Sequence, residues 1–271
     1  MVEKKTPVGK PADDFIRIQD LWSMFVPKWY WFAISLFITL TIAVLYLLST
    51  PPIYTRTAAI LVKDNSKSSS STSAMNDFSD LGIFKSNTNI NNELLTLKSP
   101  TLMTEVVNRL GLNETFTIRK GLKNVDLYKV SPVTITFCDK IEVPLSFTIK
   151  FSSKEAFAIS ELEISGEDIG ETLSAQMGDS IQTSAGIMIV SPTQEFTDAF
   201  IGTSIRYVRG SVRAAVDTYS NALVAELGNE DATIINLSIN DTSIRKAEDI
   251  LNTLIEVYNE NWIRDKNQIA V

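Results

Sequence analysis

The sequence predicts an α+β protein with one N-terminal transmembrane helix, an exported α/β domain with a mixed sheet, and a long C-terminal helix. Three observations predict this class. The first is a run of twenty residues without a charge, at 29–48. The second is strict alternation of apolar and polar residues at 133–137 and 145–151. The third is an apolar stripe at helical spacing that begins at Ile244.

The composition excludes several kinds of catalytic and metal site. The 271 residues are 44% hydrophobic with a net charge of −7, which suits a folded domain rather than a disulfide scaffold or a disordered chain. No histidine is present, which removes Ser-His-Asp and Cys-His sites and every zinc site that needs histidine. Cys138 is the only cysteine. The acidic balance argues against a nucleic-acid partner. We therefore expect no catalytic residues, no cofactor and no metal.

The uncharged run 29–48 is predicted to span a membrane, because a helix of this length covers about the 30 Å core of a bilayer. A cleaved signal peptide fits poorly, since 28 residues precede the run and no small-residue cleavage site follows it. A buried helix of a soluble protein is the other alternative. Aromatic residues favour the headgroup region at one end. The membrane-anchoring residues are predicted to be Trp29, Tyr30, Trp31 and Leu48.

Basic residues are more frequent before this run than soon after it, and Lys28 lies at its boundary. This distribution predicts a cytoplasmic N-terminus and an exported main domain. The predicted parts are a cytoplasmic amphipathic segment (1–28), a transmembrane helix (29–48), an α/β domain (49–240) with a mobile serine-rich loop (64–77), and the start of a long helix (241–271) that we expect to continue in a longer protein.

Within the exported domain the elements are expected in a fixed order. Ser99, Pro100 and Gly111 are typical of the cap, first turn and end of a helix. The expected helices and strands are a strand at 54–62, helices at 90–97 and 100–110, strands at 133–137, 145–151, 157–164, 187–190 and 204–208, a helix at 210–221, and strands at 223–227 and 233–239.

The C-terminal helix has one apolar face, and its start is expected to pack on the domain's own sheet as far as Ile255. Past Tyr258 we expect the helix to extend beyond the sheet, so that its apolar residues, among them Ile269, need a partner helix or a neighbouring subunit. The residues predicted for helix packing or oligomer contacts are Leu254, Ile255, Tyr258 and Trp262.

Three stretches carry a resemblance to a known family. They are 52–62, just after the apolar run, 92–107, and 235–252 running into Tyr258. In this order the chain resembles the N-terminal and periplasmic part of the Wzz-type polysaccharide co-polymerases, the chain length determinants. It is most similar to the Bacteroidetes-type capsular tyrosine kinases that carry such a domain.

The resemblance implies an inner-membrane protein with a periplasmic α/β domain that forms homo-oligomeric rings. It also implies control of O-antigen, capsule or exopolysaccharide chain length together with a Wzy-type polymerase and the nascent polysaccharide. The sequence lacks the second span of the family and any phosphate-loop motif of a cytoplasmic tyrosine kinase. The family carries no catalytic residues in this part, and none are transferred.

Two clusters of charge have alternative interpretations. Three arginines at i, i+3 and i+7 lie near one face if Gly210 does not interrupt the register. They either contact an anionic glycan or a neighbouring subunit, or form a solvated face with local pairs. These arginines are Arg206, Arg209 and Arg213. An acidic cluster at 161–171 is either a glycosidase carboxylate pair or, more simply, surface charge.

Three functions therefore compete. The first is a non-catalytic co-polymerase scaffold. The second is the transmembrane sensor or adaptor portion of a bacterial tyrosine kinase. The third, an anchored hydrolase, is disfavoured by the missing histidine.

Overall fold

The computed structural model describes residues 26–62, 87–139, 143–228 and 234–269. The chain divides into two compact units, Met1–Thr50 and Pro51–Val271. The amphipathic segment expected before residue 26, the whole serine-rich loop expected at 64–77, and the side chain of Ile269 lie outside the described residues.

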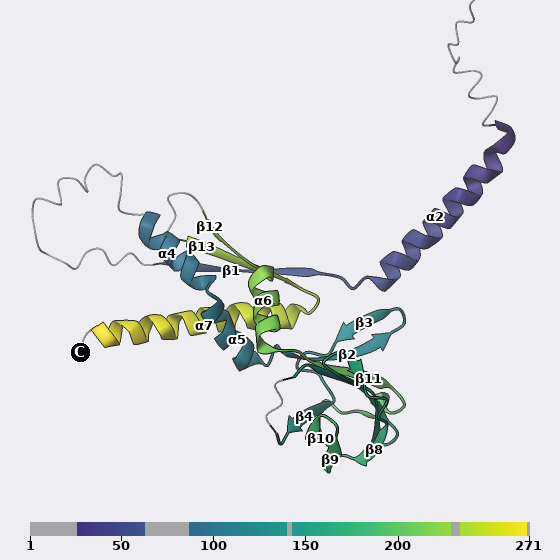
Figure 1. Ribbon diagram of the computed structural model, residues 1–271. Helices are drawn as coiled ribbons and strands as arrows, with labels where there is room; N and C mark the ends of the chain where they lie inside the picture. Colours follow the sequence, from purple (N-terminus) through teal and green to yellow (C-terminus); the bar gives the residue numbers. More distant parts are fainter. Residues whose placement is uncertain (1–25, 63–86, 140–142, 229–233, 270–271) are drawn as a thin grey trace, which may run out of the picture. The chain divides into compact units, whose positions relative to one another are not determined.

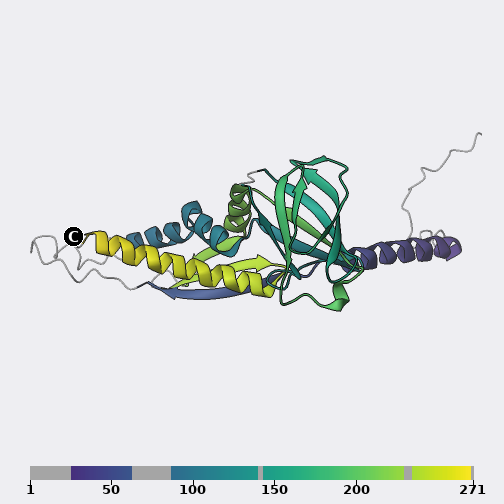
Figure 2. The same ribbon diagram turned by 90° about the horizontal axis from the view of Figure 1, so that it is seen from below.

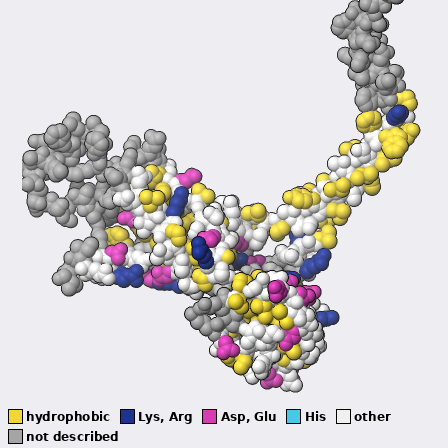
Figure 3. Space-filling view, viewed as in Figure 1, with side chains coloured by type: hydrophobic (Ala, Val, Ile, Leu, Met, Phe, Trp, Pro, Cys, Tyr) yellow, Lys and Arg dark blue, Asp and Glu magenta, His cyan; other side chains and the backbone are white. Residues whose placement is uncertain are grey.

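The first unit contains a short 3-10 turn, η1 (Val26–Lys28), and the helix α2 (Trp29–Ser49), drawn in Figure 1. No residue of α2 is buried, and hydrophobic side chains cover it in Figure 3. The Thr39 and Thr41 hydroxyls each donate a hydrogen bond of 2.8 Å to the carbonyl four residues earlier. These two hydroxyls therefore have their hydrogen bonds within the helix, as polar groups in lipid require. By length and composition α2 is a candidate membrane span.

The second unit has two hydrophobic cores, and the first belongs to what we call the α/β lobe. Three strands form its sheet in the order β1-β13-β12, and both pairings are antiparallel. Figure 2 shows the helices lying beside this sheet. The bounds are β1 (Tyr54–Leu61), α4 (Asn87–Leu97), α5 (Pro100–Leu110), α6 (Val212–Ala222), β12 (Leu223–Leu227), β13 (Ile234–Asp241) and α7 (Ile244–Ile269).

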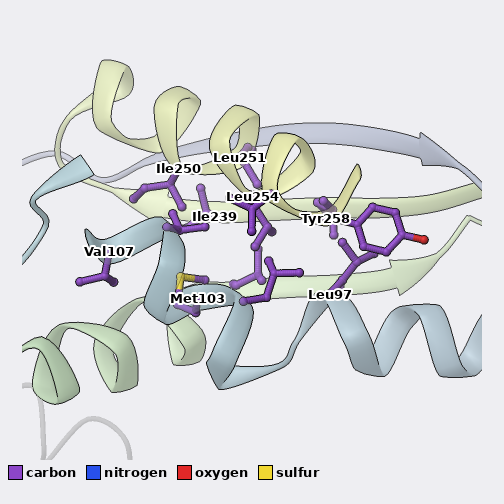
Figure 4. Packing of buried hydrophobic residues seen from close by; sticks show 14 of the residues in the cluster. Leu97, Met103, Val107, Ile239, Ile250, Leu251, Leu254 and Tyr258 are labelled. Carbon is purple, nitrogen blue, oxygen red and sulfur yellow. The ribbon is translucent and has the colours of Figure 1, made fainter. Parts of the chain in front are cut away.

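One face of this sheet is buried by helices, because alternate strand residues are apolar. On the central strand Ile235, Leu237 and Ile239 are buried, while the residues between them are not. Figure 4 shows Ile239 meeting side chains of α5 and α7. The helices contribute to the same core mainly through Leu97, Leu102, Met103, Val106, Val107, Ile250, Leu251, Leu254, Val257 and Tyr258.

The second core lies in a β lobe, residues 114–209, inserted between α5 and α6. One sheet has the order β3-β2-β11-β5-β6-β7, with β8 paired to β6, and the other has the order β4-β10-β9. The bounds are β2 (Glu114–Lys120), β3 (Lys123–Asp126), β4 (Val133–Phe137), β5 (Leu145–Phe151), β6 (Ala156–Ile164), β7 (Glu167–Asp168), β8 (Leu173–Gln176), β9 (Ser180–Thr183), β10 (Gly186–Pro192), η2 (Asp198–Phe200) and β11 (Ser204–Arg209).

The chain enters and leaves the β lobe through adjacent segments. Glu114 pairs with Arg209 across β2 and β11, and the Gly210 N–H donates to the Asn113 carbonyl at 2.8 Å. The β lobe is therefore held to the α/β lobe by a two-stranded stem.

The predicted fold class is confirmed: an N-terminal apolar helix precedes an α+β unit that ends in a long helix. The sheet differs from the expected mixed one, since the described strands form three sheets whose pairings are all antiparallel. Tight connections such as β5–β6 and β9–β10 allow only antiparallel pairing, and parallel neighbours need a longer crossover.

Candidate interaction surfaces

The first half of α7 belongs to the core of the α/β lobe. Leu254 is fully buried and Ile255 is half-buried against the same cluster. Tyr258 is also buried, and its hydroxyl donates a 2.6 Å hydrogen bond to the Glu93 carboxylate on α4. Burial, and then this hydrogen bond, raise the pKa of Tyr258. Leu254 and Tyr258 thus pack inside their own lobe.

Beyond Tyr258, one side of α7 contacts α5 and another side is exposed. The Arg109 guanidinium on α5 donates two hydrogen bonds to Glu260, at 3.1 and 2.5 Å, and this contact lowers the pKa of the Glu260 carboxyl. Trp262 is 40% exposed and Ile263 is 53% exposed. An open hollow of about 620 Å³ is lined by Glu260, Ile263, Arg264, Asn267 and Gln268. The end of α7 therefore presents apolar side chains at the surface.

The three arginines do not form one face, because Gly210 separates a strand from a helix. Arg206 and Arg209 lie on β11 and point to opposite faces of its sheet, since their spacing is odd. Arg206 pairs with Glu163 at 3.1 Å, and Arg209 lies over the Phe137 ring at 4.9 Å.

Arg213 lies on the next element, α6, and is exposed. Gly210 thus interrupts the register, and the condition under which Arg206, Arg209 and Arg213 would share a face is not met. The physical reason is that helical spacing does not continue across the end of a strand.

The acidic cluster is engaged in local contacts. The Thr148 hydroxyl donates to Glu161 at 2.7 Å, and the Ser146 hydroxyl donates to Glu163 at 2.8 Å. The Glu171 carboxylate accepts from the Ser184 N–H. These contacts fit surface charge better than a glycosidase pair. Within the described ranges, no group of His, Cys, Asp and Glu side chains is placed to hold a metal ion.

A buried polar junction joins the β lobe to α7. The Lys246 ammonium pairs with the Asp126 carboxylate at the end of β3, and both side chains are about nine-tenths buried. Lys129 pairs with Asp249 at 2.6 Å. The Tyr128 ring lies near both ammonium groups, 5.5 Å from Lys129 and 5.7 Å from Lys246. The junction therefore fixes the β lobe to α7 at two successive turns of the helix.

Our sequence analysis did not identify this junction. Burial lowers the pKa of the Lys246 ammonium, but Tyr219 and Asp126 outweigh that effect, so the pKa is raised. One signal was available: Lys246 lies four residues before Ile250 and eight before Leu254, on the apolar side of the helix. A lysine at such a position needs a buried anionic partner.

The residues predicted to anchor the chain lie at the two ends of α2. Trp29, Tyr30 and Trp31 form its first turn, Leu48 lies in its last turn, and all four are exposed. Aromatic side chains are common at such positions, where the ends of a membrane span meet the lipid headgroups.

Residues 14–110 match the family model Wzz, chain length determinant protein. The resemblance to the Wzz family is thereby confirmed over this part of the chain. The matched range contains α2, β1, α4 and α5, so it joins the candidate span to the first elements of the α/β lobe. No curated protein matches the chain.

Proposed function

We propose that the chain is a membrane-anchored module of a polysaccharide co-polymerase. In this proposal it is a non-catalytic oligomeric scaffold that regulates the chain length or export of O-antigen, capsular polysaccharide or exopolysaccharide. The observation that carries the proposal is the Wzz family match, which includes the candidate span and the first elements of the α/β lobe, β1, α4 and α5.

The proposed placement is the bacterial inner membrane, with the N-terminus in the cytoplasm and the α/β and β lobes in the periplasm. The basic residues that precede α2, Lys28 among them, support this orientation. The proposed partners are further copies of the chain, a Wzy-type polymerase and the growing polysaccharide.

The proposed contact residues fall into two groups. Ile255 and Trp262 on α7 are proposed to support oligomer contacts, with Leu254 and Tyr258 holding that helix in place from inside the lobe. Arg213 is the arginine we propose for an anionic glycan or subunit contact, because Arg206 and Arg209 already have protein partners.

The direct test is removal of the gene from its bacterium, followed by electrophoresis of the surface polysaccharide. We expect the preferred chain length to be lost and to return when the gene is supplied again. A length distribution that is unchanged by deletion would contradict the proposal.

The lobe junction favours a second candidate, the sensor portion of a tyrosine kinase. Because Lys246 and Asp249 tie the β lobe to α7, a displacement of the β lobe would be passed to this helix. In the bacterium, Lys246→Met would then change tyrosine phosphorylation of the associated kinase domain. Unchanged phosphorylation in that variant would argue against the sensor.

A further inference from the structure

The sheet of the α/β lobe has one face that no described element covers. The helices pack on the face that carries Ile235, Leu237 and Ile239. The opposite face, which we call the outer face, carries two complete rungs of side chains across β1, β13 and β12. These rungs are Ala59, Asn236 and Glu226, and Thr57, Ser238 and Val224.

The outer face is hollowed and almost uncharged. The six residues of the two rungs line an open hollow of about 550 Å³, together with Ala58 and Leu237. Apolar residues flank it, with Leu61 70% exposed and Ile234 41% exposed. Glu226 is the one charged residue of the rungs, and within the described part of the chain it has no ion pair. Apolar side chains therefore enter this hollow without removing many charges from water.

The end of α7 offers a complementary surface. Ile263 is more than half exposed, and Arg264 follows it. The Arg264 guanidinium donates to the Asn261 side chain and also lies near Glu260. We call Ile263 and Arg264 the α7 ridge. It carries one apolar and one cationic side chain, and the hollow carries small side chains and one anion.

The two surfaces are on the same chain but cannot meet within it. α7 contacts β1 and β13 from the inner face of the sheet, through residues such as Leu251 and Leu254. A side chain at the end of this helix does not reach the outer face of the same sheet. Contact between the two surfaces therefore requires a second copy.

We propose that the α7 ridge of one copy docks in the outer-face hollow of the next, with Ile263 between the rungs and Arg264 paired with Glu226. This inference rests on the proposed oligomeric scaffold and names its docking surfaces. Because ridge and hollow are different surfaces, the contact is heterologous, and each copy uses one surface for each neighbour. For copies anchored in the same direction in a membrane, such contacts close into a ring around the membrane normal when the rotation between neighbours divides a full turn.

The test is the mass of the detergent-solubilised full chain, measured by light scattering over a series of concentrations. Ile263→Asp disables the ridge, and Ala59→Arg fills the hollow at an exposed site. We expect each variant to associate at least tenfold more weakly than the wild-type chain. Val208→Asp and Ser204→Arg place the same side chains on the exposed face of β11 and should leave the mass unchanged.

A mixture of the two variants tests the proposed contact more specifically than either variant alone. Ile263→Asp keeps an intact hollow and Ala59→Arg keeps an intact ridge, so an equal mixture should form one-to-one pairs and nothing larger. The charge pair is tested by Glu226→Arg and Arg264→Glu, each of which should weaken association about tenfold. The double reversal should restore it.

The outcomes separate this inference from the function on which it rests. If the wild-type chain is oligomeric and both Ile263→Asp and Ala59→Arg keep its mass, these docking surfaces are wrong while the scaffold stands. A double reversal that is as weak as the single ones overturns the Arg264–Glu226 pair. A wild-type chain that is monomeric at every concentration overturns the scaffold and the docking surfaces together.

Discussion

At the scale of single residues, the Lys246–Asp126 pair is where the molecule is most sensitive. Lys246→Met leaves the Asp126 carboxylate buried without its partner, which we expect to lower the free energy of unfolding by about 3–5 kcal/mol. Chemical denaturation of the detergent-solubilised chain measures the loss. The exposed Lys154–Asp198 pair is the control, and Lys154→Met should leave stability unchanged.

The same measurement on a double variant tests whether the unpaired Asp126 carboxylate causes the loss of stability. Lys246→Met with Asp126→Leu removes both charges, so it should lose less stability than Lys246→Met alone. A double variant that is less stable than the single one would show that Asp126 stabilises the junction through contacts other than the ion pair, such as the hydrogen bond that it accepts from the Tyr128 N–H.

Sequence reasoning at this scale worked for apolar residues and failed for paired charges. Leu254 and Tyr258 were predicted to share the apolar stripe of the C-terminal helix, because helical spacing alone decides which residues share a face. The partners of Arg206 and Lys246 lie 43 and 120 residues away in the chain. No local pattern contains such distances, so these contacts required the fold.

At the scale of the element, the end of α5 depends on the backbone of Gly111. Its φ is +63°, in the left-handed region, and its N–H donates to the Val107 carbonyl. No atom lies within 4 Å of an added Cβ, so Gly111→Ala has only a conformational cost, which we expect to be about 1 kcal/mol. Thermal melting should show a lower midpoint for Gly111→Ala and no change for Gly210→Ala, which lacks a positive φ.

Alanine substitutions in the two halves of α7 are expected to have different effects on stability. Leu254→Ala opens a cavity in a packed core and should lower the free energy of unfolding by about 2–5 kcal/mol. Ile263→Ala removes only exposed surface and should leave the stability of the single copy unchanged. Equal losses at both positions, in denaturation at concentrations where the chain is monomeric, would contradict this division of α7.

The sequence predicted the helix whose first and last residues are typical of helix ends, and it missed the short strands. The helix at 100–110 was predicted with its cap, first turn and end because Ser99, Pro100 and Gly111 act locally. Strands β7 and β8 have two and four residues, too few for alternation to be visible. The strand β2 alternates only over Thr115–Ile118, which is too short a stretch to predict a strand.

At the scale of the whole molecule, stability should be flat near neutral pH and fall steeply in alkali. No histidine titrates between pH 6 and 8. Burial raises the pKa of Tyr207, Tyr219 and Tyr258 above the ordinary tyrosine value of about 10. Above about pH 10 the unfolded chain releases these protons while the folded chain keeps them, so stability decreases as pH rises.

Thermal melting from pH 6 to pH 11 measures this dependence. Tyr258→Phe removes one of the contributing protons and should make the alkaline decline shallower, whereas Tyr54→Phe, at an exposed tyrosine, should not. An alkaline decline of the same slope in the Tyr258 variant would contradict the assignment.

The division into two lobes could not be predicted from the sequence, for a physical reason. The α/β lobe pairs β1 with β13, which are joined only after the whole β lobe has been completed. Such long-range pairing is set by which apolar faces fit together and leaves no local signature. The expected single sheet was therefore divided into three.

The central claim is that this chain assembles as an anchored scaffold, and the mass of the detergent-solubilised chain tests it most directly. Light scattering corrected for bound detergent gives that mass without a reference shape. We predict a discrete oligomer of high order whose mass does not change over a tenfold range of concentration. A monomer throughout that range would contradict the account.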